Sequence, residues 1–351
     1  MWIRPAVLSV FLCSLSAPVL AEDLAAILDA ADALEPLEVV IVARDGEVIA
    51  ERSYDGHDPD APTNIKSASK TVMSALVGIA IDRGVLDGAD QKVAELLPDD
   101  LPDDADPRLD DLTVGHLLSM QAGLAPTSGA NYGRWVVSRN WVRYALAQPF
   151  ETDPGGDMLY STGSTHLLSA ILTRAGENST LALARDWFAP LDDFAIGGWA
   201  RDPQGIYLGG NEMAMSPRSL LAFGELYRND GLAPDGTRLL SQDWIDQSWT
   251  QRTSSIYTGD GYGYGWFFRQ VAGEDVRYAW GYGGQMLFII PSQDLTVVMT
   301  SDESLPSAAN GYLEHLNDLL TEIVISVRDE PSAGTPSEGL DIPVSPHNPQ
   351  P

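Results

Sequence analysis

Short apolar runs and amphipathic segments follow one another along the chain in an order that predicts its fold. Near the start, residues 39–44 and 47–51 flank Asp45-Gly46, a pattern typical of a β-hairpin. In the last third, glycines and prolines separate four apolar and aromatic runs. We expect these runs to form consecutive strands over residues 262–268, 276–280, 286–290 and 295–300.

Elsewhere the apolar residues recur at every third or fourth position, which indicates helices. The predicted helices cover residues 24–34, 64–81, 114–120, 160–175, 216–227 and 308–327, and the aromatic segment 132–146 is compatible with a helix. Thr113 and Ser216-Pro217 are typical helix starts, and Gly123 and Gly231 follow the corresponding ends.

This order of elements predicts an α+β fold of the α/β sandwich type. Strands from the N- and C-terminal segments would join in one antiparallel sheet flanked by helices, with a helical subdomain inserted between them. We expect one enzyme-sized domain over residues 22–328. Its α/β part would lie in residues 22–88 and 205–328, and the helical insert in residues 89–204.

The two termini differ in composition from this domain. Residues 1–21 combine Arg4, an apolar run and the small-residue site Val19-Leu20-Ala21, which together indicate a cleavable signal peptide. Residues 329–351 are rich in proline, serine, glycine and acids, so we predict a disordered tail. The mature protein is therefore expected to be periplasmic or secreted, with no stable membrane span.

The formal net charge of −29 limits the partners that we expect. Nucleic acids and anionic membranes bind cationic surfaces, so this charge excludes nucleic acid and disfavours anionic substrates. The single cysteine, Cys13, lies in the predicted signal peptide, and the five histidines have no spacing typical of paired metal ligands. We expect no metal and no other cofactor, while the oligomeric state is open.

Candidate chemistry begins with Ser67-Ala68-Ser69-Lys70 at the head of an apolar helix. Residues three apart share a helix face, so the Ser67 hydroxyl can meet the Lys70 amine, as a serine nucleophile with a lysine base requires. Only Lys70 of the three lysines has a serine three positions before it. Chance supplies such a match about one time in five, so a polar helix start is an equally simple interpretation.

Two later segments favour the catalytic interpretation. Tyr160-Ser161-Thr162 precedes an apolar helix, where a tyrosine can pass a proton between nucleophile and leaving group, although most tyrosines in such places are structural. The segment from Tyr278 to Gln285 is rich in glycine. Glycine in a strand lets a substrate or another backbone segment approach closely.

These three segments, in this order, resemble the serine β-lactamase and penicillin-binding superfamily. The resemblance is strongest to the class C β-lactamase-related branch, which includes esterases and 6-aminohexanoate-dimer hydrolases. It covers residues 36–325 and includes the phrases Leu112 to Leu124 and Met215 to Gly224. It implies a β-lactamase-like serine hydrolase domain.

The resemblance also implies residue roles. Ser67 would be the acylated nucleophile, Lys70 its general base and Tyr160 the second acid/base. The oxyanion hole would use the backbone N–H groups of Ser67 and Gly281. A base at this place must be neutral at pH 7, which requires Lys70 to lose about three pKa units through burial, at a cost of about 4 kcal/mol.

Two residues depart from the superfamily pattern. Thr162 stands where asparagine is usual, and Tyr278 stands where β-lactamases carry lysine or histidine to receive a substrate carboxylate. The neighbouring Arg277 would point to the other face of the strand. We expect Thr162 and Tyr278 to contact substrate, together with three further residues of the third segment: Trp280, Tyr282 and Gly283.

The predicted function is a secreted or periplasmic serine hydrolase that cleaves a neutral or cationic ester or small amide through a Ser67 acyl-enzyme. The alternative is a penicillin-binding, sensor-type or non-turnover binding protein of the same fold. D-peptidase and true β-lactamase activities are less favoured, because the third segment lacks the cation at position 278. The substrate, the preference for ester or amide, and the efficiency of deacylation are open.

Overall fold

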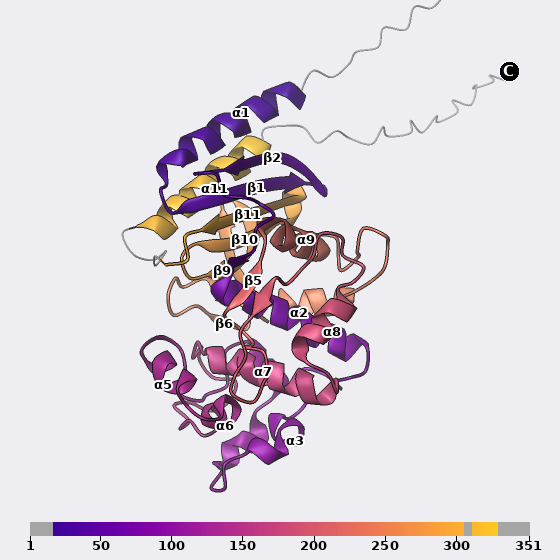
Figure 1. Cartoon of the computed structure of the whole chain (residues 1–351), viewed down its shortest axis with the longest axis vertical. Helices are drawn as coiled ribbons and strands as arrows, with labels where there is room; N and C mark the ends of the chain where they lie inside the picture. The colour runs from indigo at the N-terminus through magenta and orange to yellow at the C-terminus, as the bar shows by residue number, and fades with distance from the viewer. Residues whose placement is uncertain (1–16, 305–310, 329–351) are drawn as a thin grey trace, which may run out of the picture.

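An eight-stranded sheet, antiparallel between all neighbours, forms the centre of the protein (Figure 1). The computed structural model describes residues 17–304 and 311–328. The strand order is β2-β1-β11-β10-β9-β8-β7-β6, so the N-terminal hairpin lies beside the last strand of the chain. The strands are β1 (Leu37–Arg44), β2 (Glu47–Ser53), β6 (Thr253–Ser254), β7 (Gly261–Tyr262), β8 (Phe267–Val271), β9 (Glu274–Gly281), β10 (Gln285–Ile290) and β11 (Leu295–Ser301).

Both faces of this sheet are buried, which explains why its central strands are almost continuously apolar. Along β1, Val39 and Ile41 belong to one hydrophobic core, whereas Val40 and Val42 belong to a second core. The strands β10 and β11 divide their side chains between the same two cores. Since successive residues of a strand point to opposite faces, each central strand contributes to both cores.

Helices cover each face of the sheet. On one face, α1 (Ala17–Ala30) and α11 (Tyr312–Arg328) pack against each other and against the second core (Figure 1). On the other face, α2 (Ser69–Asp82) and α9 (Pro217–Arg228) contact the strands. The whole of α2 from Ser69 to Ala80 is buried, because this helix lies between the sheet and the helical region.

The helical region lies at the end of the molecule away from α1 (Figure 1). Its helices are α3 (Val93–Leu96), α4 (Val114–Leu118), α5 (Tyr132–Val136), α6 (Trp141–Leu146), α7 (Thr162–Ala175) and α8 (Thr180–Trp187). The later helix α10 (Gln242–Ser248) packs its Trp244 ring against Gly78 of α2. A three-stranded sheet joins β3 (Thr63–Asn64), β5 (Met213–Met215) and β4 (Gly198–Trp199).

Short 3₁₀ helices connect several of these elements. One of them, η2 (Lys66–Ala68), carries Ser67 and runs directly into α2. The others are η1 (Ala31–Ala33), η3 (Pro98–Asp100), η4 (Pro107–Asp111), η5 (Gly129–Asn131) and η6 (Pro291–Gln293).

The predicted fold class is confirmed, with several local differences. The helix expected over residues 24–34 starts earlier, at Ala17, and the helix expected over residues 64–81 starts later, because Asn64 pairs in β3. The expected strand 262–268 divides into β7 and β8, because Gly265 adopts a φ of 80° and the chain turns there. The aromatic segment 132–146 forms two short helices, α5 and α6, separated by an irregular segment. Thr113 and Ser216 cap α4 and α9 with their side chains, as predicted.

Several sequence predictions concern residues that lie partly or wholly outside the described ranges. Residues 1–16 and 329–351 lie outside the described residues, and residues 17–21 of the predicted signal peptide form the start of α1. The signal peptide and the tail stay predictions. The start of the expected helix 308–327 also lies outside the described residues, and α11 begins at Tyr312. The limits of the helical insert stay predictions as well. Within residues 17–304 and 311–328, no helix has the length and apolar character needed to cross a membrane.

Candidate active site

Ser67 lies in the turn that starts the buried helix α2. Lys66 has a φ of 49° at the beginning of this turn, and the Ser69 hydroxyl donates a hydrogen bond of 2.7 Å to the Lys66 carbonyl oxygen. The turn continues into α2, which places Lys70 one helical turn after Ser67. The Lys70 Nζ atom lies 3.0 Å from the Ser67 Oγ atom. The predicted nucleophile and base are therefore in direct contact.

The Lys70 amine is buried without an acidic partner among its hydrogen bonds. Only 2% of the residue is exposed, and its Nζ atom binds the Gly210 carbonyl oxygen at 2.6 Å and the Thr162 Oγ1 atom at 3.3 Å. Burial lowers the pKa of Lys70 from 10.5 to about 7. This shift corresponds to about 5 kcal/mol against burying the protonated amine. A large part of the population therefore carries a neutral amine near pH 7.

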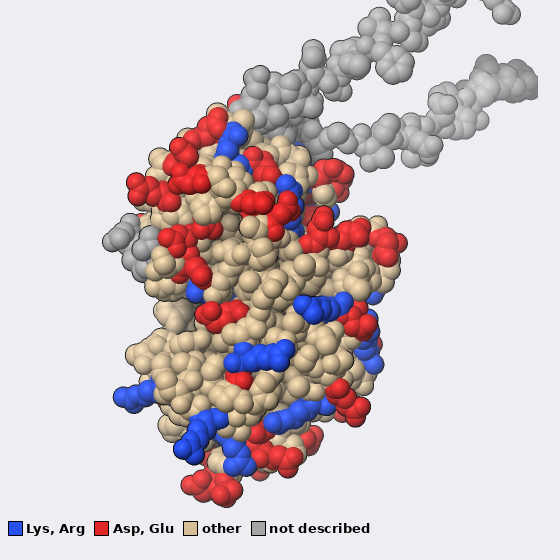
Figure 2. Space-filling view, in the orientation of Figure 1, with Lys and Arg blue, Asp and Glu red and all other residues tan. Residues whose placement is uncertain are grey.

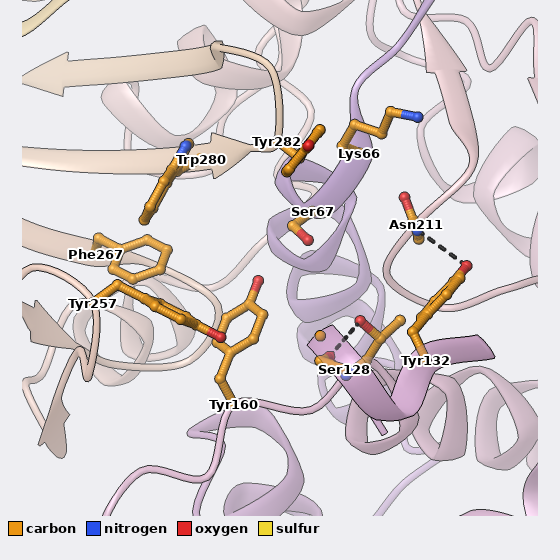
Figure 3. Close-up of a pocket in the computed structure, with 12 residues that line it drawn as sticks. Lys66, Ser67, Ser128, Tyr132, Tyr160, Asn211, Tyr257, Phe267, Trp280 and Tyr282 are labelled. Atoms are coloured by element: carbon orange, nitrogen blue, oxygen red, sulfur yellow. Dashed lines mark hydrogen bonds between the residues drawn. The ribbon is translucent and has the colours of Figure 1, made fainter. Parts of the chain in front are cut away.

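Tyr160 reaches Ser67 from the segment before α7. Its hydroxyl points toward Ser67 (Figure 3), and the Lys70 Nζ atom lies 5.0 Å from the centre of its ring. Burial raises the pKa of the Tyr160 phenol well above its ordinary value. Tyr160 is therefore a neutral phenol at pH 7, and it can donate a proton to an atom bound near Ser67.

Thr162 links Lys70 to Ser128. The Thr162 and Ser128 hydroxyl oxygens lie 3.0 Å apart, and the Thr162 backbone N–H donates to Ser128 Oγ at 2.8 Å. A neutral amine has two N–H donors and one lone pair, and the Gly210 carbonyl can only accept. If Thr162 accepts the second N–H, the lone pair of Lys70 faces the Ser67 hydroxyl.

The end of β9 lies against the turn that holds Ser67. A Cβ atom at Gly281 would lie 2.2 Å from the Ile65 carbonyl oxygen, so a side chain does not fit there without displacement of the backbone. This close approach brings the main chain of Gly281 beside the nucleophile turn. The placement suits the oxyanion donor that was predicted for Gly281, and that role stays a prediction.

A cavity of about 490 Å³ opens over Ser67 (Figure 3). Aromatic side chains and a few polar groups line it: Lys66, Ser67, Ser128, Gly129, Tyr132, Tyr160, Thr162, Asn211, Tyr257, Phe267, Trp280 and Tyr282. None of these is acidic, and the Lys66 amine is paired with Glu303 at 2.8 Å and Glu212 at 3.8 Å. The described residues contain no group of three histidine, cysteine or acidic side chains able to hold a metal ion.

Comparisons with known proteins agree with this geometry. The family named Beta-lactamase matches residues 35–320. The chain belongs to the beta-lactamase family. A curated relative, the 6-aminohexanoate-dimer hydrolase of Paenarthrobacter ureafaciens, is 26% identical over 315 residues, which cover 83% of this chain and 77% of the relative.

Two solved structures share the fold of this chain. EstCE1, described as a hydrolase with promiscuous acyltransferase activity, superposes with a TM-score of 0.68 at 18% identity, covering 88% of this chain and 100% of that chain. A class C beta lactamase from Rhodobacter sphaeroides gives a TM-score of 0.64 at 15% identity, covering 88% and 99%. At these identities the likeness concerns the fold.

The structure places three of the five expected substrate contacts at the cavity and two away from it. Thr162, Trp280 and Tyr282 line the cavity, whereas Gly283 lies in the β9–β10 turn with a φ of 89° and is not a lining residue. Tyr278 is only 2% exposed. Its hydroxyl donates to Asp260 at 2.5 Å, and its ring stacks on Phe267. The expected contact of Tyr278 with substrate is therefore wrong, because its side chain is directed into the second core.

The cavity also contains residues that sequence reasoning missed. Five of them lie outside the three motifs, in loops or at the ends of elements: Ser128, Tyr132, Asn211, Tyr257 and Phe267. Their spacing carries no motif, since the fold alone brings them to Ser67. The only available signals were the aromatic segment that contains Tyr132 and the Gly209-Gly210 pair that precedes Asn211.

Replacing Lys70 with methionine tests whether the amine is neutral. The unfolded chain keeps its proton to about pH 10.4, whereas the folded protein releases it near pH 7. The free energy of unfolding should therefore rise between about pH 7 and pH 10 by about 4 kcal/mol more in the wild type than in Lys70→Met. Denaturant titrations at about pH 6, 8 and 10 measure this difference. A constant difference across these pH values contradicts the low pKa.

Proposed function

We propose that this protein is a secreted or periplasmic serine hydrolase that cleaves an ester or small amide through an acyl-enzyme on Ser67. The observation that carries the proposal is the contact of 3.0 Å between the Ser67 hydroxyl and a buried Lys70 amine. An amine with a pKa of about 7 is able to accept the serine proton near neutral pH. Tyr160 lines the same cavity, and because its hydroxyl points toward Ser67, it completes the set.

Acylation uses these three groups in sequence. The Ser67 Oγ atom attacks the substrate carbonyl carbon while its proton moves to the Lys70 Nζ atom. The negative oxygen of the tetrahedral intermediate accepts hydrogen bonds from the backbone N–H groups of Ser67 and Gly281, each worth about 3 kcal/mol in such sites. The carbon–oxygen or carbon–nitrogen bond then breaks as Tyr160 protonates the leaving group and regains a proton from Lys70. Water releases the acyl group by the reverse transfers.

Thr162 and Ser128 together replace the asparagine that the superfamily pattern has at position 162. Thr162 accepts an N–H from Lys70 and donates its own proton to Ser128. This direction leaves the Ser128 proton available to the cavity, where it can bind a substrate oxygen. The two hydroxyls thus hold the lone pair of Lys70 toward Ser67 and supply the donor that one amide side chain would provide.

The charges around the cavity support a neutral or cationic substrate. Tyr278 offers no cation to a substrate carboxylate, and Lys66 is already paired with two carboxylates. In Figure 2, Asp and Glu side chains crowd the surface at the end of the molecule that carries α1 and β2. The relative that hydrolyses the 6-aminohexanoate dimer and the hydrolase EstCE1 support hydrolysis over binding alone.

A fluorophosphonate probe tests the nucleophile. We expect one adduct per chain, located on Ser67 by peptide mass spectrometry and absent from Ser67→Ala. The labelling rate should rise as the pH passes through about 7, because Lys70 must lose its proton to act as a base. Lys70→Ala should label at least about a hundredfold more slowly.

Labelling is then paired with a hydrolysis panel of p-nitrophenyl esters, short amides, D-Ala-D-Ala peptides and nitrocefin, with Ser67→Ala as the blank. The proposal expects turnover of an ester or short amide. No adduct on Ser67 would refute it. An adduct without turnover of any of these substrates would favour the sensor-type alternative.

Two substitutions of similar size test the link through Thr162. Thr162→Val removes the hydroxyl and leaves the second N–H of Lys70 without an acceptor, so kcat/KM for p-nitrophenyl acetate should fall about tenfold to a hundredfold. The pH at half-maximal kcat/KM should also fall, because the protonated amine loses an acceptor. Thr162→Ser keeps the hydroxyl and should retain most activity. Equal effects of both substitutions would contradict the proposed link.

A further inference from the structure

The cavity has two chemically different sides, with Ser67 between them (Figure 3). We define the ring side by Tyr160, Tyr257, Phe267 and Trp280, and the polar side by Lys66, Ser128, Tyr132 and Asn211. An ester or amide bound with its carbonyl carbon at Ser67 therefore places one half of the molecule among aromatic rings. The other half lies among hydroxyl, amide and amine groups.

The rings of the ring side are steeply inclined to one another, and Tyr257 is nearly perpendicular to two of its neighbours. Tyr257 meets Tyr160 at an interplanar angle of 75° with 5.6 Å between ring centres, and meets Trp280 at 88° with 6.3 Å. Phe267 lies 6.0 Å from Trp280 at 60°. These rings present both faces and edges to the cavity, and a flat aromatic guest gains contacts with both.

The ring side carries no formal charge of its own. Its residues are three phenyl-type rings and one indole, and the nearby Asp260 carboxylate lies behind it, bound to Arg269 at 2.6 Å and to Tyr278 at 2.5 Å. Ring faces also attract organic cations, by about 0.5–1 kcal/mol where the site is exposed to water. Because the Asp260 carboxylate is paired with Arg269, it adds little to this attraction, and we expect a neutral ring to bind the ring side at least as well as a cation.

The position of Tyr160 indicates which half of the substrate binds among the rings. In the proposed function it protonates the leaving group, so the leaving group must lie beside the Tyr160 hydroxyl. Tyr160 is itself a wall of the ring side, in contact with Tyr257. We propose that the ring side is the leaving-group subsite and that it selects an alcohol or amine carrying a neutral aromatic ring. This inference rests on the proposed function.

Two isomeric esters test the assignment. Benzyl acetate carries its ring on the alcohol, whereas methyl phenylacetate carries it on the acid, and cyclohexylmethyl acetate is a saturated reference for benzyl acetate. We expect kcat/KM for benzyl acetate to exceed the values for the other two esters by about tenfold. An equal or greater kcat/KM for methyl phenylacetate would overturn the assignment of the ring side to the leaving group.

Variants of Tyr257 connect this preference to the rings. Tyr257→Ala should reduce the ratio of kcat/KM for benzyl acetate over cyclohexylmethyl acetate about fivefold, and Tyr257→Phe should keep the ratio because it keeps the ring. Ile256→Ala is the matched control, since Ile256 lies on the same loop, is 61% exposed and is not a lining residue. A ratio that is the same in Tyr257→Ala and the wild type would overturn the inference.

A second pair of esters separates a ring from a cation. Choline acetate and 3,3-dimethylbutyl acetate have nearly the same shape and differ in charge. We expect no advantage of choline acetate over its neutral analogue in kcat/KM, and a preference for choline acetate above tenfold would overturn the inference.

If no ester is hydrolysed and the fluorophosphonate probe does not label Ser67, the proposed function fails. Normal turnover of p-nitrophenyl acetate without selectivity for benzyl acetate defeats this inference alone.

Discussion

The removal of the Lys70 amine from water is the constraint on which the rest of this structure depends. Its cost of about 5 kcal/mol is comparable with the net stability of many domains, so the surrounding fold must hold the amine firmly. The backbone at Gly209-Gly210 makes this possible. A Cβ atom at Gly209 would lie 2.2 Å from the Thr165 carbonyl oxygen, and one at Gly210 would lie 2.2 Å from the Thr165 hydroxyl oxygen. Only glycine lets this loop bring a carbonyl oxygen to the lysine.

The sheet holds the main chain on the other side of Ser67 in place. Because both faces of its central strands are buried, β9 is held rigidly, and its last residue, Gly281, meets the turn before Ser67. Position 278 of β9 carries tyrosine where β-lactamases carry lysine or histidine. Tyr278 belongs to a partly buried network with Asp260 and Arg269 and stacks on Phe267, so its hydroxyl is already occupied by a carboxylate of the protein itself.

Much of the fold and the contact between Ser67 and Lys70 could be predicted from the sequence, because both depend on local pattern. The hairpin around Asp45-Gly46 and the capped helices follow from short-range rules, and Ser67 and Lys70 meet because three residues make nearly one helical turn. The cavity walls could not be predicted in this way. Ser128 and Tyr257 reach Ser67 through loops whose path is set by packing between distant segments. Tyr278 shares a face of β9 with Trp280, but the Phe267 ring stacks on it and Asp260 accepts its hydroxyl proton, so it does not line the cavity. The motif position alone had suggested a substrate contact there.

The central claim is that Lys70 is neutral in the folded protein near pH 7, and carbon-13 NMR of the lysine ε-carbons tests it most directly. The chain contains three lysines, so the Lys70 signal can be assigned by its absence from a Lys70→Arg sample. If the amine is neutral near pH 7, the Lys70 signal titrates with a midpoint near pH 7 while the protein stays folded. A Lys70 signal without a titration step below about pH 10 would show that the folded protein keeps the amine protonated.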